Sequence, residues 1–511
     1  MPEPSPDFGS LLDEPLLTVC DAVGVRANVS LPQALARLSD PHASTIAFSA
    51  AQAHQSHALH AFLVQLAAMA CARAAAAEPS TDPGWWQAQL LALSDGNASA
   101  WTLVVADLGQ PAFLQPPVPE GTIHHFTMSL PTPGSVDTVL LIPARNHDYK
   151  LNVGNSNCLE AWAYSLISTQ TQMGYILKYN GGIFRMNKGN GNRPGIGLRT
   201  GFDLGKNFRR DLEIVQKNRD HVILNHNYAK DGLALLWCMS WDGKSSLAKQ
   251  TLDPWCIECC RRLRLIAENN RIRAKLTPNQ VARVEMPETY KGNSGDPWTP
   301  IDRKANKSLT LSGSGFTYRR VADLLLSPDW EPAATQEILP GDDADLWWYG
   351  RALVRGQGKT EGWHERDIPI DRRLRNRFAN RSEREALGKR AQEMITAAGV
   401  MRLGILKPAL LTLWGESAGR VDPGLRQLEE RIDGGFFPAL WDADADPARW
   451  REQLTGWARE ILATHSAAQV ENASRWRRIS LAHDRFDFGL HRKTHKELKN
   501  TFLPRVPVSV P

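Results

Sequence analysis

Glycines recur through residues 170–211, and this feature restricts the fold more than any other in the sequence. Glycine weakens helices and strands alike, so most of the stretch can form neither a long helix nor a regular strand. Its backbone groups must then bind water, a ligand or a partner chain. Loops of this length without regular structure are usually functional or disordered. The glycines concerned are Gly181, Gly182, Gly189, Gly191, Gly195, Gly197, Gly201 and Gly205.

Polar and basic side chains are interleaved with these glycines. Asparagine amides can donate to and accept from base edges, and lysine and arginine can contact phosphates. The stretch lacks the G-x-G-x-x-G pattern, set between a strand and a helix, of a dinucleotide site. It therefore predicts a nucleic-acid contact through its glycine backbone and through Asn180, Arg185, Asn187, Lys188, Asn190, Asn192 and Arg193.

A second glycine-rich segment, GQGKTEG at 356–362, looks like the end of a phosphate-binding P-loop. That motif requires a glycine five residues before Gly358, where this chain has Leu353. The preceding residues 345–356 carry three aromatics and do not resemble the strand that leads into a P-loop. We therefore expect a basic loop that lays its backbone against an anion.

Positive charge is concentrated in two places. The 511 residues carry a net charge of only +5, yet residues 171–219 hold ten Lys and Arg against three Asp and Glu. Residues 351–381 hold nine against four. Two basic islands on an otherwise slightly acidic chain indicate contacts with a polyanion at particular surfaces. The alternative is that each island is a solvated face whose arginines pair locally.

The remaining pattern predicts an α+β protein with two domains. Residues 1–380 combine short apolar runs typical of strands, such as 137–144 and 232–239, with proline- and glycine-rich connections. From 381 to 511 the spacing becomes helical, with Ser382 and Glu385 placed as a capping box. Several amphipathic helices can bury their apolar stripes only against each other, so we expect a C-terminal four-helix bundle.

The sequence also predicts a cytoplasmic protein. Its seven cysteines form no regular framework, and residues 1–10 lack the basic start and apolar run of a signal peptide. The most apolar run, 61–77, contains Gln65 and Arg73 and owes much of its apolarity to alanine. We expect a packed core helix there rather than a membrane span.

Other clusters suggest chemistry only weakly. Cys256, Cys259 and Cys260 could contribute to a zinc site, but two further ligands are missing, so reduced structural cysteines are favoured. The four-residue spacing of Asp487, His491 and His495 would put them on one helix face, where a solvated or polyanion-facing surface is favoured over a metal. The dipeptides His147-Asp148 and His483-Asp484 are too isolated for a phosphohydrolase. Trp347 and Trp348 are expected in the core, with base stacking as the alternative.

Four segments, taken together, resemble one known family. MNKGNGNRPGIGL with the preceding QTQMGY, and RGQGKTEGWHER at 355–366, resemble the large subunit of the type I-E CRISPR surveillance complex Cascade, the CasA family. LLDEPLLTV at 11–19 and QPAFLQ at 110–115 are weaker matches in the same order. The resemblance extends over nearly the whole chain, including the C-terminal helices.

The resemblance implies a non-catalytic protein without cofactors that reads the protospacer-adjacent motif in double-stranded DNA. Such a subunit helps open the duplex for pairing with the CRISPR RNA and docks the helicase-nuclease that degrades the target. Its partners are the other Cascade subunits, the guide RNA and DNA. The first glycine-rich loop would contact the motif from the minor-groove side. The wedge that separates the strands would fall at Lys359 and Thr360, flanked by Gly358 and Glu361. Lysine here departs from the amide side chains of the best-known pattern.

The sequence is also compatible with two other classes of function. One is a nucleic-acid enzyme, a nuclease or an NTPase, against which the incomplete P-loop and the lack of a carboxylate-histidine cluster count. The other is a stand-alone RNA-binding protein.

Overall fold

The chain folds into two compact units. The computed structural model describes residues 7–139, 158–174, 181–187, 191–269, 271–342, 345–356, 359–415, 418–442, 447–470 and 475–491. The first unit comprises Met1–Phe316 and Asp329–Asp371, and the second comprises Thr317–Pro328 and Arg372–Pro511. The second unit thus begins at Arg372 rather than at the predicted residue 381, and it also takes in a short segment from the middle of the chain.

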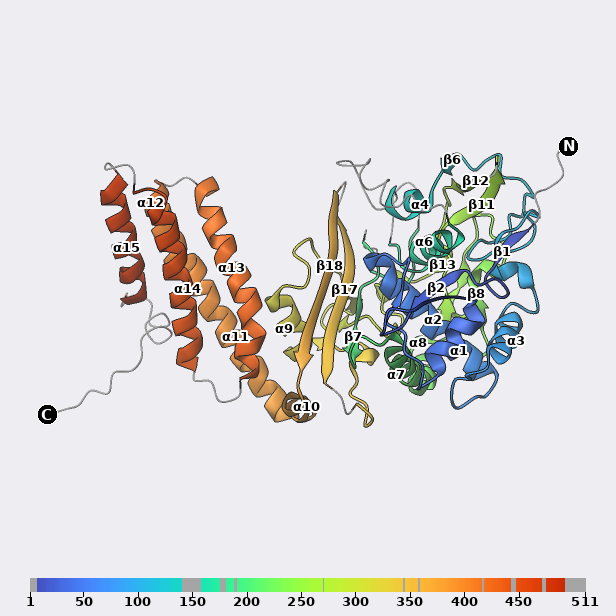
Figure 1. The fold of residues 1–511 in the computed structure, drawn as a ribbon, viewed down its shortest axis with the longest axis horizontal. Helices are drawn as coiled ribbons and strands as arrows, with labels where there is room; N and C mark the ends of the chain where they lie inside the picture. The colour runs from blue at the N-terminus through green and yellow to red at the C-terminus, as the bar shows by residue number, and fades with distance from the viewer. Residues whose placement is uncertain are drawn as a thin grey trace. The chain divides into compact units, whose positions relative to one another are not determined.

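The first unit mixes helices with many short strands (Figure 1). Its helices are α1 (Leu31–Ser39), α2 (Ala53–Arg73), α3 (Pro83–Leu93), α4 (Pro133–Val139), α6 (Leu159–Thr171), α7 (Leu204–Lys217) and α8 (Arg219–His226). Its strands are β1 (Phe8–Ser10), β2 (Leu17–Cys20), β3 (Arg26–Val29), β4 (Ala47–Phe48), β5 (Thr102–Val104), β6 (Met128–Leu130), β7 (Gly195–Arg199), β8 (Leu233–Leu235), β9 (Leu247–Ala248), β10 (Leu252–Ile257), β11 (Arg262–Glu268), β12 (Arg271–Thr277), β13 (Val284–Glu285), β14 (Ile301–Asp302), β15 (Lys307–Ser308), β16 (Trp330–Glu331), β17 (Leu346–Gly356) and β18 (Lys359–Ile370).

Helix α2 forms the centre of this unit. Residues 58–71 of the helix are almost entirely buried, and α2 packs against α3, α6, α7 and β10. A helix that is apolar on all sides is stable only when other elements surround it. The run at 61–77 is thus confirmed as a core helix over its helical part, which ends at Arg73.

Short apolar runs were a poor guide to the strands. Residues 137–139, predicted as the start of a strand, belong to α4, and the rest of the run at 137–144 lies outside the described residues. The run at 232–239 contains the short strand β8, followed by a 3-10 turn, Leu236–Cys238. A short apolar run fits a buried helix as well as a strand, and periodicity cannot separate the two.

A three-stranded antiparallel sheet in the order β18-β17-β7 joins the two glycine-rich segments. Strands β17 and β18 form a long hairpin, visible in Figure 1, in which Leu346 pairs with Ile370 at the base and Gly356 with Lys359 at the tip. The register shifts between Val354 and Arg355, which marks a bulge close to the tip.

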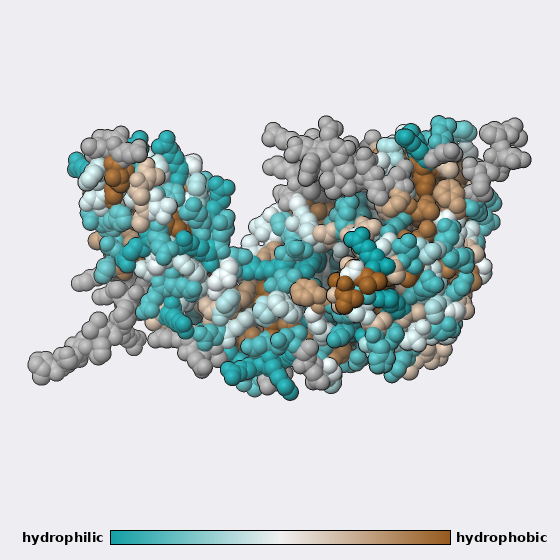
Figure 2. Space-filling model, viewed as in Figure 1, coloured by the Kyte–Doolittle hydropathy of each residue, from teal (hydrophilic) through white to brown (hydrophobic). Residues whose placement is uncertain are grey.

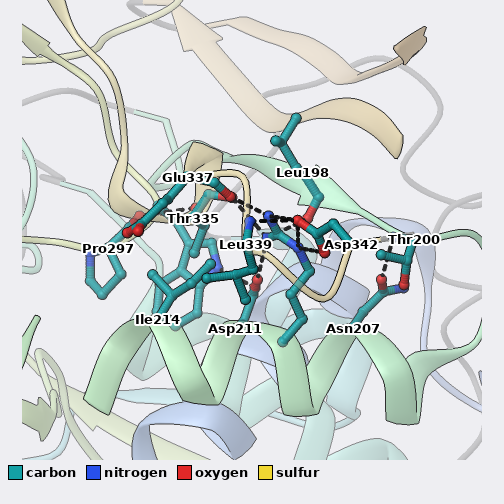
Figure 3. A network of polar contacts seen from close by, with 12 residues as sticks. Leu198, Thr200, Asn207, Asp211, Ile214, Pro297, Thr335, Glu337, Leu339 and Asp342 are labelled. Atoms are coloured by element: carbon teal, nitrogen blue, oxygen red, sulfur yellow. Dashed lines mark hydrogen bonds and ion pairs between the residues drawn. The ribbon is translucent and has the colours of Figure 1, made fainter. Parts of the chain in front are cut away.

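Arg210 in α7 links strand β7 to residues 335–342; Figure 3 labels its partners Leu198, Thr335 and Asp342. It donates to the backbone oxygens of Leu198 at 3.2 Å and Thr335 at 3.1 Å, and Nε lies 3.0 Å from Oδ1 of Asp342. Arg210 also donates to the backbone oxygen of Glu337. This buried arginine fixes where β7 lies relative to α7, because each of its donors has a partner.

The second unit is helical. It contains α9 (Tyr318–Leu326), α10 (Arg372–Ala379), α11 (Arg381–Gly399), the π-helical turn η7 (Val400–Leu406), α12 (Lys407–Trp414), α13 (Ala418–Trp441), α14 (Pro447–Ala467) and α15 (Trp476–His491). Helix α13 packs against α11, α12 and α14, and α12 packs against α15. A C-terminal helical region is thus confirmed, and the four-helix count stays a prediction.

The N-cap of α11 differs from the predicted one. The cap of α11 is Asn380, whose side-chain oxygen accepts from the backbone nitrogens of Ser382 and Glu383, so the predicted capping box two residues later was wrong. Asparagine is as good an N-cap as serine, and Asn380, which comes two residues earlier than Ser382, caps the helix. Helix α14 begins at Pro447 and buries Trp450, Leu454 and Ile461.

One helix among the described residues is long and apolar enough to cross a membrane, judged by length and composition alone. It is the continuous run Ser382–Trp414 through α11, η7 and α12. Core helices of globular units pass the same test, and this run packs against α13, α14 and α15. Figure 2 shows polar residues over most of the visible face, with small separate apolar patches.

Candidate nucleic-acid interface

A single buried guanidinium closes the neck of the first glycine-rich segment. Arg261 Nη2 donates to the backbone oxygen of Gly174 at 2.7 Å, and Nη1 donates to that of Gly181. Its own backbone nitrogen donates to Oε1 of Gln170 at 2.7 Å, which fixes it to the end of α6. The chain therefore leaves at Gly174 and returns at Gly181 around one arginine, and residues 175–180 between them lie outside the described residues.

The returning segment 181–187 is held from below by a buried carboxylate. Oε2 of Glu258 accepts from the backbone nitrogen of Phe184 at 2.8 Å, and Oε1 lies 3.2 Å from Nε of Arg185. Burial raises the pKa of Glu258 to about 7, although Arg185 opposes the shift. Gly182 and Asn187 are partly exposed on this supported segment, so a ligand can reach them.

Arg193 supports the loop from inside instead of facing solvent. Its Nε lies 2.6 Å from Oδ2 of Asp296, and its guanidinium carbon lies 5.2 Å from the ring centre of Trp298. Arg193 is 2% exposed and Arg185 1%. Burial lowers the pKa of Arg193, against the attraction of Asp296. This corrects the expectation that these two arginines contact phosphate, because both guanidiniums are already engaged with carboxylates.

The structure brings the two glycine-rich segments together. The backbone nitrogen of Asn192 donates to the oxygen of Leu353 at 2.8 Å, near the tip of the β17–β18 hairpin. Directly afterwards β7 pairs with β17, with Gly195 opposite Arg351. The Asn192 side chain is only 6% exposed, so Asn192 connects the two segments through its backbone alone. Segments more than 150 residues apart in sequence therefore share one sheet edge.

The hairpin tip is not a P-loop. Lys359 and Thr360 begin strand β18, and Thr360 pairs with Arg355 across the hairpin. A P-loop needs these residues at the start of a helix, where backbone N–H groups converge on phosphate. Lys359, Thr360 and Glu361 are described here by their backbone alone. Gly358, Lys188 and Asn190 lie outside the described residues, so their predicted roles stay predictions.

One neighbour of the first segment was missed by the sequence reading. Gly292, with φ at +79°, lies so close to Met186 and Asn187 that an added Cβ would come within 2.5 Å of their backbone atoms. Lys291 beside it has φ at +43° and is exposed. This left-handed Lys-Gly turn thus packs its backbone against the loop, while Nζ of Lys291 lies 3.4 Å from the backbone oxygen of Ala305. The dipeptide in YKGNSG is a turn signal, but nothing in the sequence connects it with residues 100 positions away.

The alternative metal clusters do not assemble among the described residues, where no group of three or more His, Cys, Asp or Glu could hold a metal ion. Sγ of Cys259 lies 3.3 Å from the oxygen of Leu114, and Sγ of Cys260 lies 3.5 Å from that of Thr169. Burial raises the pKa of Cys256 to about 12, so its thiol stays protonated. These residues behave as buried free cysteines.

The predicted C-terminal face is also explained in part. Oδ1 of Asp487 lies 3.1 Å from Nη2 of Arg459 in α14, and both side chains are exposed. Nδ1 of His491 lies 2.7 Å from the backbone oxygen of Asp487. His495, His147 and Asp148 lie outside the described residues. Asp487 is thus part of a solvated ion pair, as the favoured interpretation expected.

No protein-family model matches the chain. No curated protein matches it either.

Solved structures do match. The chain is similar to CasA (Cse1) of Thermus thermophilus, at 16% identity and a TM-score of 0.59, covering 95% of this chain and 99% of that one. Cse1 from Acidimicrobium ferrooxidans gives 15% identity and a TM-score of 0.62, covering 98% and 100%. A chain in a CRISPR RNA-guided surveillance complex gives 13% identity and a TM-score of 0.59, covering 95% and 100%. The resemblance drawn from the four segments is thereby confirmed at the level of the fold, which is that of CasA (Cse1) proteins.

Proposed function

We propose that this chain, which has the CasA (Cse1) fold, is the non-catalytic large subunit of a type I-E Cascade complex. In that role it recognises a protospacer-adjacent motif in double-stranded DNA and promotes opening of the duplex by the guide RNA. It then recruits a helicase-nuclease. Its partners are the other Cascade subunits and the guide RNA, and we propose the cytoplasm as its location.

The contact between the two glycine-rich segments is the observation that supports this proposal. The hydrogen bond from Asn192 to Leu353, followed by the β7–β17 pairing, places a glycine backbone and a basic hairpin tip at one sheet edge. A flexible backbone can approach the floor of the minor groove, where base edges distinguish mainly A·T from G·C pairs. Such a reader tolerates several related motifs, which suits a protein that scans DNA.

The hairpin tip suits a wedge. Paired strands up to Gly356 and Lys359 give the tip a rigid base, and the nearby bulge increases the local twist. Inserting a side chain at a base step costs a few kcal/mol of unstacking, which phosphate contacts and guide pairing must offset. We assign the wedge to Lys359 and Thr360, flanked by Gly358 and Glu361. Around them Gly182, Asn187, Lys188 and Asn190 form the reading surface, and the buried Gly181 and Asn192 hold it in place through their backbones. Arg193 supports that surface from below.

The test uses the complex reconstituted with guide RNA. Lys359→Ala or Thr360→Ala should weaken binding to a duplex that carries the motif far more than binding to the single-stranded target. Lys244→Ala, at an exposed lysine in another turn of the first unit, is the matched control and should bind both DNAs normally. Equal losses on duplex and single strand would remove the wedge role.

The enzyme alternative has its own readout. Purified chain incubated with ATP or DNA and divalent metal should release no product. Turnover that survives further purification would make a nuclease or NTPase the better assignment. A chain that binds guide RNA without any other subunit would instead favour the stand-alone RNA-binding protein.

A further inference from the structure

An exposed aromatic ring lies at the base of the sheet, away from the hairpin tip. Phe202, in the turn between β7 and α7, is 67% exposed. The guanidinium carbon of Arg199 lies 4.5 Å from the centre of its ring. The ring of Trp347, at the start of β17, lies 6.4 Å away centre to centre. Trp347 is itself only partly buried, whereas its neighbour Trp348 is fully buried in the core.

The turn that presents Phe202 is rigid. The backbone nitrogen of Thr200 donates to Oδ1 of Asn207 at 3.0 Å, and Nδ2 of Asn207 donates to the oxygen of Gly201 at 3.1 Å. Figure 3 shows Asn207 reaching from α7 to Thr200. On the other side, the backbone nitrogen of Leu204 donates to the oxygen of Thr45 at 2.7 Å. The exposure of the ring is thus built into the turn rather than a result of loose chain.

An exposed lysine follows the ring by four residues. Lys206 in the first turn of α7 is exposed, and no ion pair holds its ammonium within the part of the chain that the structure describes. The two nearby carboxylates are engaged: Oδ1 of Asp203 accepts from the backbone nitrogen of Lys206 at 2.8 Å, and Asp367 lies 3.0 Å from Arg199 and 2.8 Å from Arg351. A lysine this close to a helix N-terminus is unfavourable against the helix dipole, so an anion is the expected neighbour.

Two aromatic rings, a stacked guanidinium and a free ammonium match the chemistry of an unpaired nucleotide. Its base stacks on aromatic and arginine planes, and its phosphate takes the cation. A duplex hides its base faces and would not use the rings. Trp347 and the hairpin tip lie at opposite ends of β17, about 30 Å apart at roughly 3.4 Å per residue. The surface is therefore distinct from the reader of the motif.

We propose that Phe202, Trp347 and Arg199 form a stacking platform for one unpaired base of a nucleic-acid strand, with Lys206 on the adjoining phosphate. This inference rests on the proposed function, because duplex opening and the guide RNA both supply unpaired nucleotides. The base can come from target DNA or from guide RNA, and the experiment separates these sources.

The first experiment is photo-cross-linking in the reconstituted complex. Iodinated uracil is placed in the target strand, in the displaced strand or in the guide RNA, one at a time. A cross-link mapped to the peptide with Phe202 or Trp347 is expected from one of the three strands, and that strand is then the source. Cross-links from none of them at this peptide would overturn the platform.

The second experiment measures binding of a labelled single-stranded oligonucleotide by the full chain. Phe202→Leu keeps an apolar side chain but removes the ring, and should weaken binding about tenfold, as expected for one lost base stack. Lys206→Gln should make the dependence of log affinity on log salt shallower by about 0.7. Leu224→Ala, at a residue 79% exposed on α8, is the matched control and should bind normally.

The outcomes separate this inference from the proposed function. Normal binding by Phe202→Leu, with a duplex defect in Lys359→Ala, would remove the platform and keep the motif reader. Weak binding by Phe202→Leu, with no discrimination of any motif by the complex, would keep the platform and remove the proposed function. If Leu224→Ala binds as weakly as Phe202→Leu, the effect is not specific to the ring and the platform is wrong.

Discussion

The two basic islands look alike in the sequence but differ in the folded chain. The first spends its arginines inside: Arg185 and Arg193 pair with buried carboxylates. The second keeps Arg372 and Arg373 exposed at the start of α10. Local pairing was the alternative interpretation of each island, and it holds for the interior arginines of the first. The number of Lys and Arg residues in a segment therefore indicates its surface charge only after the residues that pair with buried acids, such as Glu258 and Asp296, have been subtracted.

The largest expected effect tests the buried charge of the first island. Asp296→Asn leaves the Arg193 guanidinium buried without a counter-charge, and should lower the free energy of unfolding by about 3–5 kcal/mol. Glu460→Gln, which breaks the exposed pair with Arg431, is the control and should cost less than about 1 kcal/mol. Urea unfolding followed by circular dichroism measures both. Equal small losses would mean that Arg193 reaches solvent.

The next effect concerns the neck. Arg261→Met removes the donors to Gly174 and Gly181 and should cost about 3 kcal/mol, because buried carbonyls lose charge-assisted hydrogen bonds. Hydrogen exchange should accelerate at the Gly174 and Ile183 amides, which bond within the neck. Exchange in β11 and β12 is the internal reference. An unchanged pattern in the neck would show that the arginine does not close it.

A smaller effect depends on pH. The pKa of Glu258 is raised to about 7 from an ordinary value near 4.5 in the unfolded chain. The folded state then holds a proton that the unfolded state has lost, so this group makes stability fall as pH rises from about 4.5 to 7. Glu258→Gln should flatten that part of the profile, by on the order of 3 kcal/mol. A profile unchanged by the substitution would mean that Glu258 stays ionised beside Arg185.

The smallest effect concerns the exposed charge. Lys188→Gln in the first island, and Arg372→Gln with Arg373→Gln in the second, should each make the dependence of log affinity for duplex on log salt shallower, by at most about 0.9 per lost phosphate contact. That is about threefold in affinity per contact between low and physiological salt. Arg193→Gln should change stability without changing the slope. A slope change for Arg193 alone would reverse the comparison.

Local patterns predicted the helical parts of the fold better than the rest. Helix α2 follows from the length and alanine content of the apolar run at 61–77, and the helical spacing after residue 381 predicted the C-terminal helices. The apolar run at 137–144 failed, because a few buried residues carry no period. The cap of α11 failed by two residues because Asn380 competes with Ser382 for the same role. Tertiary context chose between local alternatives that were nearly equal.

The candidate interface was predictable in outline but not in chemistry. The sequence located both glycine-rich segments, because glycine and lysine mark them directly. It could not show that Asn192 and Leu353 meet, since pairing over this separation leaves no local signal. Nor could it separate Arg193, which has a carboxylate partner 103 residues away in Asp296, from Lys206, which forms no ion pair within the described residues. Burial depends on the fold. For the same reason, the sequence did not reveal that the Lys291-Gly292 turn packs against the first segment or that Phe202 is exposed.

The pairing of β7 with β17 fixes the spacing between the two glycine-rich segments. Since side chains alternate across a sheet, inserting one residue into either strand would turn Gly195 and Gly197 away from their tight contacts with His57 and Tyr349. Changes of length are therefore tolerated only outside the paired residues of β7 and β17, in the loops themselves. Under the proposed function, relatives of this chain would alter the motif they accept through loop length and composition, while the spacing between backbone reader and wedge would stay constant.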